Sequence, residues 1–188
     1  TQFKERDPEA TGLMVATLSR QHLLMIAAPG TAKSAMLFAL AGAIDGATTF
    51  VRLLTKYTVP EEVFGAVKLS ALKQDKFERN TKGKLAEAHF ALLDEIFRSN
   101  SALLNMLLTA INERKFDNDG QRLDIPLESV VGASNSLPEE GGELAALFDR
   151  FLLRYVPSYI QEDGNFVDML RAPEPKLQTR ITLDELHQ

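Results

Sequence analysis

The chain has 188 residues, of which 45% are hydrophobic and 25% charged, and its formal net charge at pH 7 is −5. These values indicate one globular domain with a sizeable core and exclude a disordered chain, and the acidic balance gives no general attraction to nucleic acid. Because there is no cysteine and the three histidines are scattered, disulfides and thiolate metal sites are excluded, and any metal should be a hard ion held by oxygen.

The first twenty residues predict a helix. Asp7-Pro8-Glu9 is a favourable helix start because proline is tolerated in the first turn, and Leu13, Ala16 and Thr17 follow at helical spacing. An apolar strand is predicted at 22–26, and a loop of small residues then leads into a helix at 35–44. Since that helix is apolar on nearly every side, we expect a sheet to bury it.

The loop at 27–34 is typical of a phosphate-binding loop. Small residues let successive backbone N–H groups point at an anion, and the N-terminus of the following helix adds unpaired donors. Lys33 would reach the β- and γ-phosphates, and Ser34 would place its hydroxyl on Mg²⁺. The candidate nucleotide-binding residues are Ala28, Pro29, Gly30, Thr31, Ala32, Lys33 and Ser34.

Two alanines depart from the pattern G-x-x-x-x-G-K-[ST], because Ala27 and Ala32 stand where it has glycine. Glycine is favoured there for positive φ or close backbone approach, so each alanine either has negative φ or adds strain. The loop alone is equally compatible with an ordinary strand-turn-helix.

A strand is predicted at 48–55 and a short helix, ended by glycine, at 59–65. The stretch 68–84 then carries six basic residues against two acidic ones. It is either a solvated hairpin or insertion, or a contact surface for an acidic or nucleic-acid substrate.

Two carboxylates follow a short apolar run at 90–93. Such a run predicts a buried parallel strand whose C-terminal end opens into the crevice where α/β sheets bind ligands. Asp94 would hold Mg²⁺ through water, and Glu95 would orient and deprotonate a water that attacks the γ-phosphate. The same pattern occurs at ordinary strand ends, but a Lys-Ser loop about sixty residues earlier makes it more informative.

The next segments complete the pattern of a sheet. A helix at 99–114 has a serine-rich start that can cap it, and a hairpin at 115–126 carries Asn118-Asp119-Gly120. The strand at 127–134 runs into Asn135, which either caps a turn or senses the γ-phosphate or its attacking water.

A fifth strand is predicted at 151–156, after a helix end at 144–148. The sequence is mixed from 157 onward. Ala172-Pro173-Glu174-Pro175 is typical of a linker, and 181–188 resembles the first turn of a further element. Five strands alternating with helices predict an α/β fold, a three-layer αβα sandwich with a five-stranded parallel sheet and a β-hairpin insertion.

The chain resembles the MoxR family of AAA+ ATPases, especially its RavA-like branch. The stretches that carry the resemblance are PGTAKS (29–34), LTKYTVPEEVFG (54–65), LDEIF (93–97), LLTAINER (107–114), GASN (132–135) and LFDRFL (147–152). They cover about 53–170 closely and the phosphate loop well, whereas the first twenty residues are looser.

The resemblance implies a role for each matching position. Lys33 and Ser34 resemble the Walker A lysine and serine, Asp94 and Glu95 the Walker B pair, Asn135 the sensor 1 residue, and Arg150 an arginine finger that reaches a neighbouring subunit. An ordinary salt-bridge partner is the alternative for Arg150. The family often carries alanine at position 32, but Ala27 departs from its usual glycine and leaves tight ATP binding in question.

The resemblance also implies an organisation and a partner. Residues 1–170 would form the AAA+ core, and 171–188 a linker towards a helical lid. The function implied is Mg²⁺-dependent ATP hydrolysis by a ring, expected to have six subunits, which remodels proteins together with a von Willebrand factor A (vWA) type partner. The alternatives are a DNA-translocating ring, favoured by 68–84 and opposed by the acidic balance, and a catalytically weak interaction module, supported by Ala27.

We expect a cytoplasmic protein. The apolar stretches are interrupted by Pro, Lys or Asp well short of the length of a membrane span, and no charged-then-apolar leader opens the chain. The absence of cysteine is compatible with a reducing compartment.

Overall fold

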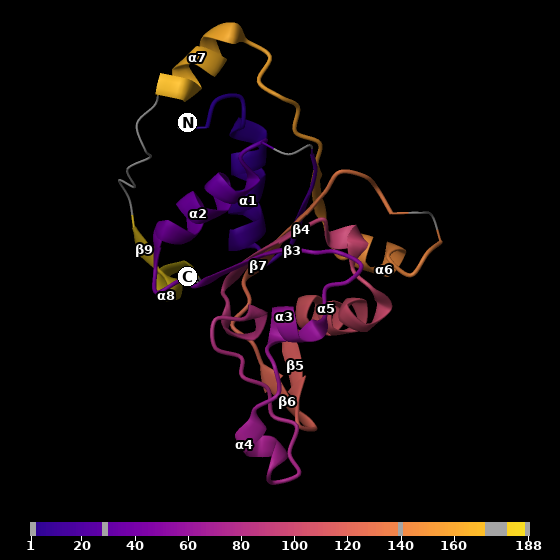
Figure 1. Ribbon diagram of the computed structural model, residues 1–188. Helices are drawn as coiled ribbons and strands as arrows, with labels where there is room; N and C mark the ends of the chain where they lie inside the picture. Colours follow the sequence, from indigo (N-terminus) through magenta and orange to yellow (C-terminus); the bar gives the residue numbers. More distant parts are fainter. Residues whose placement is uncertain (1–2, 28–29, 139–140, 172–179, 187–188) are drawn as a thin grey trace.

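The computed structural model describes residues 3–27, 30–138, 141–171 and 180–186, built around one parallel sheet (Figure 1). Its strands lie in the order β3-β4-β7-β1-β8, and every neighbouring pair is parallel. Their bounds are β1 (Leu23–Ile26), β3 (Thr49–Leu53), β4 (Phe90–Asp94), β7 (Ser129–Ser134) and β8 (Leu153–Tyr155). The five-stranded parallel sheet that the sequence predicts is confirmed.

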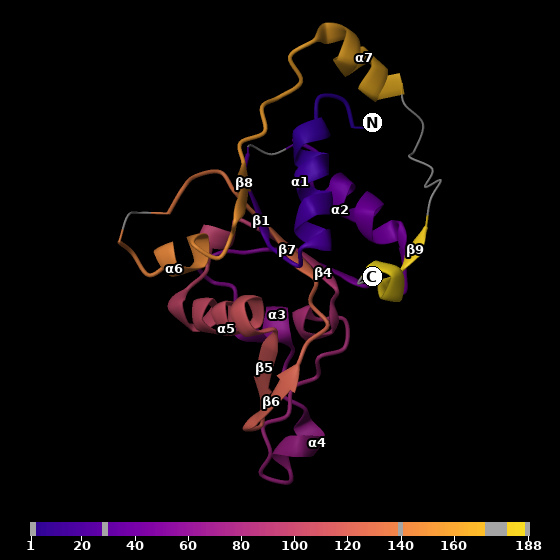
Figure 2. The ribbon, with the colours of Figure 1, turned by 180° about the vertical axis from the view of Figure 1, so that it is seen from behind.

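Helices cover both faces of the sheet. Figure 2 shows α1 (Asp7–Leu18) and α2 (Lys33–Gly42) on one side, with α3 (Pro60–Phe64), α5 (Ser101–Glu113) and α6 (Ala145–Phe148) on the other. Because side chains alternate along a strand, Leu23 and Met25 join the core under α1 and α2, whereas Leu24 joins the core under α5. The molecule is therefore the predicted three-layer sandwich.

Two helices differ from their predictions. α2 is buried on one face only, since Met36 and Leu37 are almost inaccessible while Phe38 is 50% exposed. α5 is capped by Asn100 and not by a serine, because the Asn100 side chain accepts a hydrogen bond of 3.0 Å from the backbone N–H of Leu103. Ser101 is the first residue of the helix and cannot serve as its cap.

Short elements lie outside the central sheet. β2 (Ile44–Asp45) pairs with β9 (Ile181–Thr182), which is followed by α8 (Leu183–Leu186). The sequence did not predict α7 (Asp163–Arg171), which buries no residue. The predicted linker at 172–175 lies outside the described residues. Among those described, no helix has the length and apolar character needed to cross a membrane.

The two segments predicted as insertions form one projection, here called the arm (66–84 and 115–124). The arm contains α4 (Leu69–Leu72) and the predicted hairpin, made of β5 (Lys115–Asn118) and β6 (Gln121–Asp124), and it extends beyond α3 and α5 (Figure 1). The side chains of Asn118 and Asp119 accept hydrogen bonds of 2.7 Å from the backbone N–H groups of Arg79 and Phe77. These contacts join the hairpin to the basic stretch.

Part of the basic excess in the arm serves its own structure. Lys68 pairs with Glu78 at 3.4 Å, and Arg79 pairs with Glu61 at 3.0 Å. The Lys68–Glu78 pair is exposed, so it contributes little to stability, whereas the Arg79 side chain is only 20% exposed.

A buried histidine directly before β1 makes hydrogen bonds to both α5 and β7. His22 Nε2 lies 3.0 Å from the carbonyl oxygen of Ile111, at the end of α5, and its Nδ1 accepts a hydrogen bond of 3.0 Å from Val130 N–H in β7. These partners require the neutral tautomer with hydrogen on Nε2. Burial lowers the pKa of the imidazole from its usual 6.5 to about 4, although the hydrogen bond to Ile111 opposes this.

The pKa of His22 predicts acid sensitivity. In the unfolded chain His22 takes up a proton near pH 6.5, whereas in the folded protein it stays neutral until about pH 4. The contribution of His22 to the free energy of unfolding is therefore complete above pH 6.5, and it falls by on the order of 3 kcal/mol towards pH 4. Urea unfolding across this range should show a smaller pH-dependent loss in His22→Gln than in the parent. His89→Gln is the control, because His89 is partly exposed, and it should keep most of the parent's loss. Equal loss in His22→Gln and the parent would contradict the assignment.

Gly65 fixes the root of the arm. It follows α3 with φ +100°, and a Cβ atom at this position would overlap the backbone carbonyl of Asn80. Arg79 also donates a hydrogen bond of 2.9 Å to the carbonyl of Gly65. The chain segments at Gly65 and at residues 79–80 therefore cannot separate without losing this hydrogen bond.

We therefore expect Gly65→Ala to lower the free energy of unfolding by roughly 3 kcal/mol, because backbone strain and steric overlap add. Gly83→Ala is the matched control: Gly83 also has positive φ, +68°, but nothing lies within 4 Å of the position of its Cβ. Strain alone should make it cost about 1 kcal/mol. Equal losses in urea unfolding would show that the overlap at Gly65 is relieved at no cost.

Candidate active site

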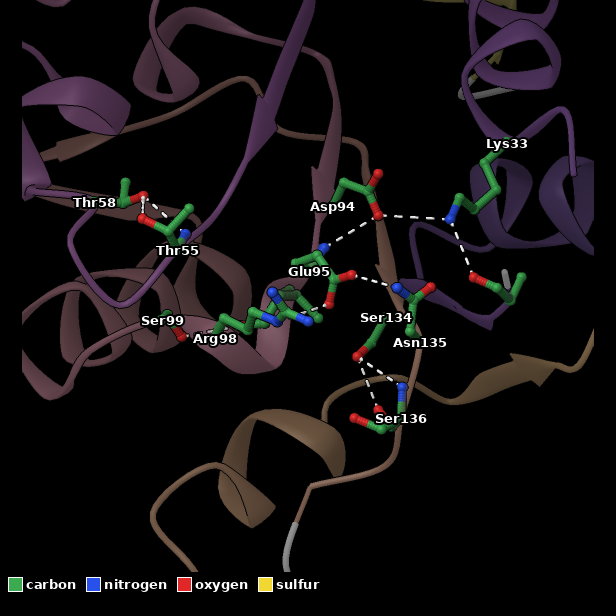
Figure 3. A network of polar contacts seen from close by, with 12 residues as sticks. Lys33, Thr55, Thr58, Asp94, Glu95, Arg98, Ser99, Ser134, Asn135 and Ser136 are labelled. Carbon is green, nitrogen blue, oxygen red and sulfur yellow. Dashed lines mark hydrogen bonds and ion pairs between the residues drawn. The ribbon is translucent and has the colours of Figure 1, made fainter. Parts of the chain in front are cut away.

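Three neighbouring strands bring the predicted site residues to one edge of the sheet. β4, β7 and β1 are parallel and adjacent, so the residues at and after their C-terminal ends lie close together. Figure 3 shows Lys33 at the start of α2, Asp94 and Glu95 at the end of β4, and Asn135 after β7 converging there. Four candidate residues that are far apart in sequence therefore lie together at this edge.

Lys33 is a buried cation with two oxygen partners. Its side chain is 8% exposed, and its Nζ donates to the carbonyl of Ala27 at 3.3 Å and lies 3.5 Å from Asp94 Oδ1. The same Asp94 oxygen accepts a hydrogen bond of 3.1 Å from Glu95 N–H. A buried ammonium needs such partners because its desolvation is costly.

Glu95 is held by two contacts. Its Oε1 accepts a hydrogen bond of 2.6 Å from Asn135 Nδ2, and its Oε2 lies 3.3 Å from Arg98 Nε. The side chain is 13% exposed, and the backbone has φ +53°, in the left-handed region. That conformation costs a non-glycine residue about 1 kcal/mol, and such strain concentrates at functional positions.

The phosphate-loop alanines have different backbones. Ala27 is not among the residues with positive φ, so replacing glycine there causes no backbone strain. Ala32 caps α2 with φ +63° and therefore carries the strain that the sequence leaves open. Gly30 has φ +82°, which glycine adopts readily. Ala28 and Pro29 lie outside the described residues.

The donors present fit a magnesium ion bound together with phosphates. Ser34 is exposed, and its hydroxyl makes no hydrogen bond within the described ranges. Among the same residues, no group of three or more His, Cys, Asp or Glu side chains could hold a metal. Mg²⁺ commonly takes one or two protein oxygens and completes its shell with substrate phosphates and water, and Ser34 with Asp94 suits that pattern.

Arg150 does not join this cluster. It follows α6, is exposed, and forms no side-chain hydrogen bond or ion pair with the residues that the structure describes. The alternative of a salt bridge within the chain therefore finds no support there.

Sequence reasoning missed two arginines that support the site. Arg6 is 5% exposed and donates to the carbonyls of Thr31, Glu5 and Ser158 at 3.4, 2.6 and 2.5 Å, so it fastens the phosphate loop to two other segments. Arg6 directly precedes α1, and its spacing of seven residues from the buried Leu13 was the available signal. Arg98, the partner of Glu95, was signalled only by its i+3 spacing.

Known proteins resemble this chain in sequence and fold. MJ0079 of Methanocaldococcus jannaschii is 41% identical over 186 residues, covering 98% of this chain and 48% of that protein. Chaperone MoxR1 of Mycobacterium tuberculosis is 29% identical over 180 residues, covering 93% of this chain and 46% of MoxR1. The chain thus spans about half the length of these relatives.

A solved structure shows the same fold. That of a candidate ATPase from Cytophaga hutchinsonii matches with a TM-score of 0.76 at 18% identity, over 97% of this chain and 56% of that one. The bpMoxR family, described as the MoxR domain in the MoxR-vWA-beta-propeller ternary systems, matches residues 1–184. The chain therefore belongs to the MoxR family.

Proposed function

We propose that this domain binds ATP and hydrolyses it. The observation that supports this most strongly is the position of Glu95 at the ligand-binding edge of the sheet. Its carboxylate accepts a hydrogen bond from Asn135, and its backbone N–H donates to Asp94, the partner of the buried Lys33. A lysine, two acids and an amide in this arrangement suit phosphoryl transfer to water, which depends mainly on positioning and electrostatic stabilisation.

The phosphate loop would bind the triphosphate. The backbone N–H groups of Ala28 and of residues 30–34 would surround the phosphates, while Pro29 has none to donate, and the N-terminus of α2 would add its dipole. Lys33 would exchange its contact with Asp94 for the β- and γ-phosphates, since its flexible stem carries three donors. Arg6 would keep the loop in place through its hydrogen bond to the carbonyl of Thr31.

Hydrolysis would depend on Glu95. Its carboxylate would accept a proton from the attacking water as the water's oxygen bonds to the γ-phosphorus. The bond from that phosphorus to the bridging oxygen would break, and ADP would leave with the bond's electron pair. Asn135 would orient the water or the γ-phosphate. Ser34 and Asp94 would hold Mg²⁺, which when bound neutralises charge on the phosphates.

Two substitutions separate binding from chemistry. Glu95→Gln keeps the shape and the contact with Asn135 but removes the base, so it should bind ATP as the parent does and lose hydrolysis by at least about 100-fold. Lys33→Ala should weaken ATP binding by roughly 10-fold or more, because it removes a cation next to the phosphates. Calorimetry and phosphate release measure the two effects. Parent-level hydrolysis by Glu95→Gln would reject the assignment.

We also propose that the domain acts in a ring of six subunits, in which Arg150 of one subunit completes the active site of the next. Its exposure and its lack of described partners support a role between subunits, where a cation can stabilise charge in the transition state. The catalytic site of each subunit would then be incomplete without its neighbour.

Mixing variants tests this sharing. Arg150→Ala should bind ATP normally and lose hydrolysis by about 1,000-fold, because an arginine finger contributes 10³ or more. When Arg150→Ala is mixed with Glu95→Gln, some sites receive Glu95 from one subunit and Arg150 from the other, so hydrolysis should partly return. No recovery in rings shown by mass photometry to contain both variants would contradict sharing.

The cellular role would be remodelling of a protein client with a vWA-type partner. The description of the matching family places its MoxR domain in MoxR-vWA-beta-propeller systems, and the relative MoxR1 is named a chaperone. We place the domain in the RavA-like branch and in the cytoplasm, with residues 1–170 as the ATPase core and 171–188 leading towards a helical lid. We expect no nucleic-acid substrate, in keeping with the net charge of −5.

A further inference from the structure

We propose that Arg98 is a positioning residue for Glu95: it holds one carboxylate oxygen so that the other faces Asn135 and the phosphate-binding edge. This inference rests on the proposed hydrolysis of ATP. Arg98 would make no contact with the nucleotide, and it lies on the short turn that joins β4 to α5 (Figure 3).

The turn places the two side chains next to each other. It forms the 3₁₀ helix η2 (Ile96–Arg98), in which Arg98 N–H donates to the Glu95 carbonyl at 2.8 Å. In a 3₁₀ helix, residues three apart in sequence lie on the same side. The left-handed backbone of Glu95 begins this turn, so its strain serves to bring the carboxylate beside Arg98.

Buried neighbours fix the turn itself. Ile96 is inaccessible and Phe97 is 8% exposed, and both belong to the core beneath α5. Asn100, which follows, caps α5 and donates to the carbonyl of Thr58 at 2.8 Å. Arg98 therefore projects from a rigid support, although its own side chain is 64% exposed.

The two contacts of Glu95 have separate roles. Asn135 occupies Oε1 at 2.6 Å, and the Arg98 guanidinium lies 3.3 Å from Oε2. A glutamate side chain with one contact still rotates about that contact, whereas contacts on both oxygens define the plane of the carboxylate. Without Arg98, the Glu95 carboxylate should remain in the site but lose its fixed orientation. Small errors in the orientation of a reacting group slow reactions strongly.

Kinetics on the whole protein test this role. Arg98→Ala should lower kcat for ATP hydrolysis by about 10-fold and leave KM within about 2-fold, because the phosphate loop is untouched. Arg98→Lys should recover part of the loss, since lysine restores the charge without the planar donor group. The double variant Arg98→Ala with Glu95→Gln should be no slower than Glu95→Gln alone, because Arg98 acts only through Glu95.

The matched control is Arg180→Ala. Arg180 is 65% exposed and pairs with Asp45 at 3.2 Å on the strand pair β2–β9, away from Glu95, so kcat should not change. Thermal unfolding of each variant should show that Arg98→Ala is as folded as Arg180→Ala.

The outcomes distinguish the two proposals. If the parent hydrolyses ATP and Glu95→Gln does not, then an unchanged or raised kcat in Arg98→Ala overturns the positioning role and leaves the proposed function standing. A further loss in the double variant also overturns it, because Arg98 would then act independently of Glu95. If the parent does not hydrolyse ATP, or Glu95→Gln hydrolyses as the parent does, both proposals fall.

Discussion

The parallel registration of β4, β7 and β1 is the constraint on which the site depends. Leu93 lies opposite Gly132, and Leu23 lies opposite both Val131 and Leu153, so neighbouring strands finish at the same edge. Parallel ladders require crossover connections, and these place helices on both faces. Residues as distant in sequence as Lys33 and Asn135 therefore meet because of the sheet and not because of any local preference.

Close packing at Gly132 makes this register possible. A Cβ atom there would lie 2.8 Å from the ring of Phe151, which is fully buried. Phe151 in turn meets the His22 imidazole edge-on, with ring centroids 6.3 Å apart. Contacts of Phe151 with Gly132 and with His22 thus hold the middle of β7 and the residue before β1 in place.

Much of this architecture was predictable from the sequence, and the reasons are physical. Apolar runs at 22–26 and 90–93 are long enough for buried strands and too short for helices, and the small residues at 27–34 leave few other conformations. Asp94, Glu95 and Asn135 were found because polar residues directly after buried strands must lie at a sheet edge. Arg150 was singled out by resemblance, and its role between subunits remains a prediction.

What the sequence did not predict depends on tertiary contacts. Arg6 lies within a charged patch and would be expected in solvent. It is buried instead, and it donates to the carbonyl of its neighbour Glu5 and to two carbonyls from distant segments. α7 was missed although Phe166, Val167 and Leu170 recur at helical spacing, because the segment has only 9 residues and buries none of them. The strain at Ala32 was left open because a φ angle cannot be read from the residue type alone.

The position of α5 has a mechanical consequence. This helix of 13 residues, about 20 Å long, begins beside the turn that carries Glu95 and ends where the first strand of the arm begins. Asn118 and Asp119 join the hairpin to the basic stretch by hydrogen bonds, so the two segments of the arm should move together. One continuous helix thus links the base of the arm to the turn that carries Glu95, so a displacement of the arm along this helix would reach that turn directly.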